Sequence, residues 1–75
     1  MTEDIDARGM RCPLPVLKLR KAMAERAAGA RLRLVADDPA ARVDVPHFCA
    51  EAGHRLIAAE ESEGQLTFVV ERGAG

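Results

Sequence analysis

The sequence predicts an α/β fold, an α+β two-layer sandwich in the order βαβαββ. Segments 31–36 and 65–72 alternate apolar and polar residues, as half-buried strands do. Segments 13–28 and 44–52 instead carry apolar residues at helical spacing. Right-handed crossovers between the strands would place both helices on one face of a four-stranded mixed sheet. The other face of the sheet would then be open to water.

The first strand is predicted at Asp4–Ala7, with Ile5 turned toward the core. A helix is predicted from Pro13 to about Ala28, with Gly29 as its left-handed cap. The apolar arc predicted for this helix consists of Val16, Leu17, Leu19, Met23 and Ala27. Arg20 falls within the arc. Two interpretations stay open. The aliphatic stem of Arg20 snorkels along the core, or Arg20 turns toward the sheet edge near the N-terminal end of the helix, next to Cys12.

The second strand, Arg31–Ala36, is followed by Asp37-Asp38-Pro39, a turn that cannot continue it. The second helix is predicted from about Asp44, the N-cap candidate, with Pro46 in the first turn. Its core-facing stripe consists of Val45, Phe48, Cys49 and Ala52. Gly53 is expected to end it.

A β-hairpin completes the predicted fold. Its strands run from Arg55 to about Glu61 and from Gln65 to Arg72, joined across residues 62–64. The sequence contains no internal repeat or linker, so we expect one small domain over residues 1–75, most simply a monomer.

Composition excludes several functions. No apolar run approaches the roughly 20 residues that cross a bilayer, so no membrane association is expected. The acidic start MTEDIDARG does not resemble a secretory signal, and two cysteines without an export signal indicate a cytoplasmic location. The chain has no Trp or Tyr and only two Phe, so direct nucleic-acid binding is not expected.

Cys12 stands directly before Pro13 and Pro15 in the run GMRCPLPVLKLRKAM, residues 9–23. If Cys12 is the helix N-cap, both prolines fall in the first turn, where N–H groups have no intrahelical acceptor. The prolines would then cost no helical hydrogen bond. They would also make the backbone next to the Cys12 sulfur rigid.

This placement predicts a reactive thiol. The free N–H groups of Leu14 and Val16 and the positive end of the helix dipole would lie beside the sulfur of Cys12. A thiolate in such a position next to Arg11 has a lowered pKa. We therefore predict that Cys12 is the catalytic residue. The residues predicted to shape its site are Gly9, Arg11, Pro13 and Pro15.

The cysteines and histidines have other conceivable roles. Cys12 could instead be a small buried core residue, the common fate of a free cysteine. The sequence has no C-x-x-C pair for a dithiol cycle. His47, Cys49 and His54 lack zinc-ligand spacing, so we expect no metal. Cys49 lies on an apolar stripe and is predicted to be a packing residue.

Basic residues dominate the segment from Arg8 to Arg33, where Glu25 is the only acid. These charges could be solvated surface, or they could form one basic face around Cys12 that steers an acidic partner. On the second interpretation Arg20 and Lys21 would help to dock that partner.

The runs DARGMRCPLPVLKLRKAM and VADDPAARVDVPHFCAEAGH, with the chain length, resemble the TusA/SirA-like (C-P-x-P) sulfur-carrier family. The resemblance implies the same βαβαββ fold. It also implies a carrier-type persulfide sulfurtransferase that needs no cofactor, in which Cys12 accepts a sulfane sulfur and passes it on. The implied donor is a cysteine desulfurase or a rhodanese-like protein. Downstream acceptor proteins in this family serve tRNA thiolation, cofactor sulfuration or sulfur oxidation.

The alternative hypothesis belongs to a different class of protein. A non-catalytic interaction or regulatory module would use the basic face and the open sheet to bind partners. A thiol at Cys12 that reacts with a sulfur donor far faster than Cys49 would distinguish the carrier from this module.

Overall fold

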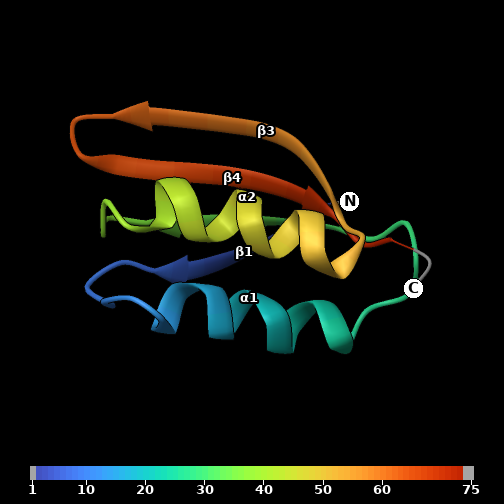
Figure 1. Ribbon diagram of the computed structural model, residues 1–75. Helices are drawn as coiled ribbons and strands as arrows, with labels where there is room; N and C mark the ends of the chain where they lie inside the picture. The colour runs from blue at the N-terminus through green and yellow to red at the C-terminus, as the bar shows by residue number, and fades with distance from the viewer. Residues whose placement is uncertain (1, 74–75) are drawn as a thin grey trace.

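The structure, a computed structural model, describes residues 2–73 and has the predicted order of elements (Figure 1). The elements are β1 (Thr2–Ala7), α1 (Leu14–Ala24), β2 (Arg31–Ala36), α2 (Ala41–Ala52), β3 (Arg55–Ser62) and β4 (Gln65–Glu71). The sheet order is β1-β2-β4-β3. β1 is parallel to β2, whereas the β2–β4 and β3–β4 pairs are antiparallel. The predicted fold class, a mixed four-stranded sheet with two helices, is confirmed.

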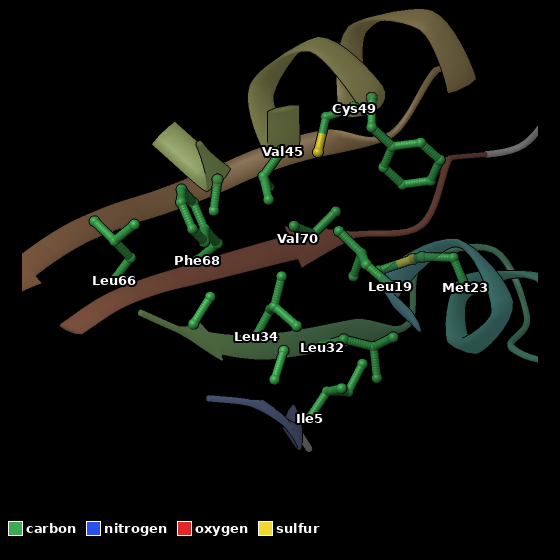
Figure 2. Close-up of a cluster of buried hydrophobic side chains, with 14 residues drawn as sticks. Ile5, Leu19, Met23, Leu32, Leu34, Val45, Cys49, Leu66, Phe68 and Val70 are labelled. Atoms are coloured by element: carbon green, nitrogen blue, oxygen red, sulfur yellow. The ribbon is translucent and has the colours of Figure 1, made fainter. Parts of the chain in front are cut away.

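One core lies between the helices and the sheet (Figure 2). The inward side chains of β2 and β4 are buried as their alternation predicts, namely Leu32, Leu34, Ala36, Leu66, Phe68 and Val70. α2 adds Val45, Phe48 and Cys49 from its predicted stripe. Since both helices bury side chains in this one cluster, they cover the same face of the sheet.

α1 is shorter than predicted, and it ends at Ala24. Gly29 is not its cap but lies in the following loop with φ +89°. There the Gly29 N–H donates to the Arg72 carbonyl, and the Arg72 N–H donates to the Ala30 carbonyl. This pairing of residues 29–30 with the end of β4 fixes the loop before them, so residues 25–28 do not continue the helix as predicted. Tertiary hydrogen bonds here outweigh the weak local preference for helix.

The buried face of α1 also differs from the predicted arc. Pro15, Leu19 and Met23, spaced four residues apart, point into the core, whereas Leu17 is 44% exposed. Ala27 lies beyond the helix and is exposed. Since Pro15 belongs to the buried stripe, the helix is rotated relative to the predicted arc.

α2 begins at Ala41, so Asp44 is not its N-cap and Pro46 is inside the helix. Ala40 is the N-cap, and Asp38, two residues before it, supplies the hydrogen-bond acceptors. Its carboxylate accepts the Ala40 N–H at 3.2 Å, and its carbonyl accepts the Ala41 N–H at 3.0 Å. These bonds satisfy donors that a helix start leaves without intrahelical acceptors, which explains the earlier start.

The hairpin is confirmed. Glu63 and Gly64 form a two-residue turn between Ser62 and Gln65, which pair with each other. β3 carries a register shift between Leu56 and Ala58, which the sequence did not predict.

The parallel pairing of β1 and β2 positions the reactive segment. Ala7 lies opposite Ala36, so the two strands end at the same edge of the sheet. The connections to α1 and α2, residues 8–13 and 37–40, therefore leave from neighbouring points. Figure 1 shows both helices starting at that end of the molecule.

Candidate active site around Cys12

Cys12 is exposed and lies in the connection between β1 and α1, whereas Cys49 is buried. The alternative in which Cys12 is a core residue is therefore wrong, and the packing role of Cys49 is confirmed. Burial raises the pKa of the Cys49 thiol and so disfavours its thiolate, the reactive form.

The helix start is displaced by one residue from the prediction. Pro13, not Cys12, is the N-cap, and Leu14 and Pro15 are the first two helical residues. Both prolines still occupy positions that need no intrahelical donor. The Leu14 N–H was expected to be free beside the Cys12 sulfur. It donates instead to the Arg11 carbonyl at 2.8 Å. The Cys12–Pro13 peptide bond is cis.

Two aspartates hold Cys12. Its backbone N–H donates to Asp38 Oδ2 at 2.6 Å, and its Sγ lies 2.8 Å from Asp44 Oδ2 as a hydrogen-bond donor. Asp38 precedes α2 and Asp44 lies in its first turn. Both groups of Cys12 are thus bonded to the segment that starts the second helix.

The predicted lowering of the Cys12 pKa is wrong for this arrangement. The hydrogen bond to the Asp44 carboxylate raises the pKa of the Cys12 thiol, and partial desolvation and the charges of Asp44 and Asp38 add to the effect. A carboxylate that accepts the S–H proton favours the neutral thiol, and its charge opposes the thiolate. Cys12 in the unbound protein therefore favours the protonated form.

The other predicted site-shaping residues lie in the same connection. Gly9 has φ +81°, and its N–H donates to both carboxylate oxygens of Asp37, at 3.0 and 3.1 Å. Arg11 is exposed, and its charge contributes to lowering the pKa of Asp38. The larger causes of that lowering are the backbone N–H groups of Cys12 and then Ala40.

Sequence reasoning missed Asp37, Asp38 and Asp44 as the direct contacts of this segment. It treated the first two as turn residues and the third as a helix cap. A usable signal was present, because parallel β1 and β2 bring their carboxyl ends to one edge of the sheet. Acidic residues after the second strand then lie beside the segment after the first.

Of the two interpretations of the basic segment, the single basic face around Cys12 does not form. Arg8 pairs with Asp6 at 2.9 Å, and Arg26 pairs with Glu3. Arg31 and Arg33 are on the open side of the sheet, where they pair with Glu71 and Asp4, each at 3.0 Å. The cationic segment is therefore divided between two faces, and half of its charges are locally neutralised.

Arg20 and Lys21 lie on different flanks of α1. The Arg20 guanidinium carbon is 5.6 Å from the centre of the Phe48 ring. Arg20 and Phe48 line a groove of about 420 Å³ between the helices. Lys21 lines a groove of about 310 Å³ beside β1. Arg20 is exposed and covers an aromatic ring, which agrees with the snorkelling interpretation; neither Arg20 nor Lys21 contacts Cys12.

The histidines have structural contacts. His47 Nε2 lies 2.8 Å from Glu51 Oε1 on the exposed face of α2. His54 Nδ1 accepts the Gly73 N–H at 3.0 Å. Within residues 2–73, no group of three or more His, Cys, Asp or Glu side chains is placed to hold a metal ion. No helix in this part of the chain is long and apolar enough to cross a membrane.

Comparison with known proteins gives consistent matches. Residues 3–72 match the family described as Sulfurtransferase TusA. A sulfur carrier protein TusA from Pseudomonas entomophila (strain L48) is 40% identical over 70 residues, which cover 93% of this chain and 88% of the relative. The crystal structure of a SirA-like protein from Desulfitobacterium hafniense superposes with a TM-score of 0.83 at 28% identity, over 97% of this chain and 99% of the other.

Proposed function

The chain belongs to the sulfurtransferase TusA family of sulfur carriers, and we propose that Cys12 carries the sulfur as a persulfide. The observation that supports this most is that Cys12 is exposed whereas Cys49 is buried. A carrier must present its sulfur to two proteins in succession, and Cys12 is open at the end where both helices begin.

The transfer is a thiol–persulfide exchange. The Cys12 sulfur attacks the outer sulfur of a persulfide on the donor, the donor S–S bond breaks, and the donor cysteine leaves with the electron pair as a thiolate. The proton of the Cys12 thiol balances the charge of the leaving group. Delivery repeats the step, with an acceptor nucleophile attacking the outer sulfur on Cys12. Neither step needs an oxidant or a cofactor.

The partners are assigned by chemistry. We propose a cysteine desulfurase or rhodanese-like protein as the donor and a downstream protein as the acceptor, in tRNA thiolation, cofactor sulfuration or sulfur oxidation. Arg20 and Lys21 are proposed to contact a partner that covers the outer surface of α1. The cytoplasmic location stays a prediction.

The alternative interaction module has less support. Its basic face is divided, and on the open side of the sheet Arg33 and Arg31 are paired with Asp4 and Glu71. Paired surface charges offer little unsatisfied electrostatic potential to a partner. The sulfur-carrier proposal is therefore favoured.

Intact mass after incubation with a desulfurase and cysteine tests the proposal. Wild type and Cys49→Ala should each gain one sulfur atom, removable by a thiol reductant, and Cys12→Ser should gain none. Cys49→Ala is the matched control, because it removes the other thiol. Loading of Cys12→Ser at the wild-type level would refute the role of Cys12.

A further inference from the structure

We propose that Asp44 is a positioning residue that keeps the Cys12 sulfur protonated in the unbound carrier and opposes any anion formed there. The proposal deepens the proposed function, on which it rests for its consequence in sulfur transfer. The contact that carries it is the 2.8 Å hydrogen bond from Cys12 Sγ to Asp44 Oδ2. It joins residues 32 positions apart, so the fold itself creates the contact.

Asp44 is well placed to act through its charge. It lies in the first turn of α2, where the positive end of the helix dipole stabilises a carboxylate. None of the ion pairs among residues 2–73 includes Asp44. Its charge is therefore directed at the sulfur without a cation in contact to offset it.

The other charged groups around Cys12 do not reverse this effect. Asp38, from the connection before α2, adds a second negative charge, although its carboxylate also binds the backbone N–H groups of Cys12 and Ala40. Arg11 is the neighbouring cation, and its charge acts on Asp38. The start of α1 contributes its dipole, but the Leu14 N–H is bonded to Arg11. The pKa of Cys12 is raised in the sum of these influences, with the Asp44 hydrogen bond as the largest.

This arrangement has a role in each half of the transfer. When Cys12 attacks a donor persulfide, its proton passes to Asp44 as the new S–S bond forms. The donor S–S bond breaks, and the departing donor thiolate takes that proton, so atoms and charge balance. A persulfide anion on Cys12 would then lie close to the Asp44 carboxylate. This repulsion favours delivery to the acceptor over storage.

The pH dependence of alkylation tests the proposal without any sulfur donor. The rate of Cys12 alkylation by iodoacetamide is measured from pH 5 to pH 10 by the mass of the peptide that contains Cys12. In Asp44→Asn the midpoint should move to lower pH. If the midpoint falls by about one pH unit, the thiolate fraction at pH 7 rises about tenfold while its nucleophilicity falls about threefold, a net gain of about threefold in rate.

Two further variants make the result specific. Glu51→Gln is the matched control: it removes the same charge from the same helix, seven residues or about 10 Å further along the axis, and should leave the midpoint unchanged. Asp44→Glu keeps the charge and should retain a midpoint near that of wild type. An unchanged midpoint in Asp44→Asn, or an equal change in Glu51→Gln, would overturn the proposal.

A second measurement separates this proposal from the proposed function. Loaded Asp44→Asn should lose its sulfur to an added thiol acceptor severalfold more slowly than loaded wild type, and equal rates would contradict the effect on delivery. If neither protein loads but the alkylation midpoint still moves, the persulfide function fails while the control of the thiol by Asp44 stands.

Discussion

Asp38 is the residue that connects the reactive segment to the second helix. One carboxylate oxygen accepts the Cys12 N–H and the other accepts the Ala40 N–H. Cys12 therefore has a fixed backbone position although it lies in an exposed connection. The same two bonds are the main reasons why the pKa of Asp38 is lowered from its ordinary value of 3.8.

Asp38→Ala should lower the melting temperature in a way that depends on pH. A carboxyl group whose pKa is lower in the folded state contributes stability above its unfolded value, and this contribution is lost as the pH falls through the folded value. The difference in melting temperature between wild type and Asp38→Ala should thus be largest above about pH 5 and shrink toward about pH 2. Thermal melts followed by circular dichroism measure it. A difference that stays constant over this range would contradict the ionic role of Asp38.

At this scale the sequence distinguished the two cysteines but not their surroundings. Cys12 precedes prolines at a helix start and Cys49 lies on an apolar stripe, and both features are local. The contacts of Cys12 with Asp38 and Asp44 span 26 and 32 positions. Local reasoning assigned a helix-start environment and hence a lowered pKa. The Asp44 carboxylate, which raises the Cys12 pKa instead, comes from α2.

At the scale of elements, the β3–β4 hairpin contains an avoidable local strain. Glu63 has φ 52° and Gly64 has φ 81°, which is the pattern of a type I′ turn. Asn-Gly is the preferred pair for this turn, whereas a long side chain in the left-handed region is unfavourable.

Glu63→Asn should therefore stabilise the protein by about 0.5 to 1 kcal/mol, or a few degrees in melting temperature. Gly64→Ala should destabilise it by about 1 kcal/mol through backbone strain. A Cβ at Gly64 would meet nothing within 4 Å, so this second variant isolates the conformational effect from steric contact. Equal stability of Gly64→Ala and wild type would show that the turn does not enforce these dihedral angles.

The sequence predicted the buried faces of the strands but not the ends of the helices. The alternation of β2 and β4 predicted their buried side chains because a strand has only two faces. Helix ends depend on more distant partners. α1 stops at Ala24 because residues 29–30 pair with Arg72, and α2 starts early because Asp38 supplies acceptors. Neither partner is visible in a helical periodicity.

For the whole molecule, the arrangement of layers decides which charges a partner meets. The open side of the sheet presents paired charges, including Arg31 with Glu71, whereas on the helix side Arg20 and Lys21 take part in none of the ion pairs formed within residues 2–73. A sequence-level sum of charge could not separate these groups, because β2 directs Arg31 and Arg33 away from the helices. The proposed docking surface is accordingly limited to the outer face of α1.

If this face docks a sulfur donor, the variant Arg20→Glu/Lys21→Glu should slow sulfur loading about tenfold or more at low salt, and the defect should diminish as salt is added. Arg20→Glu also removes a cation from the Phe48 ring, a contact worth about 0.5 to 1 kcal/mol at an exposed site, so melts are recorded beside loading rates.

Lys21→Glu is free of this complication. Its control is Arg55→Glu, the same charge reversal at a side chain on β3 that is 75% exposed; since Arg55 also pairs with Glu71 at 3.6 Å, its melt is recorded as well. Loading by Lys21→Glu should be slower than loading by Arg55→Glu. Equal rates for these two variants, or a defect in the double variant that salt leaves unchanged, would return Arg20 and Lys21 to the role of solvated surface charges.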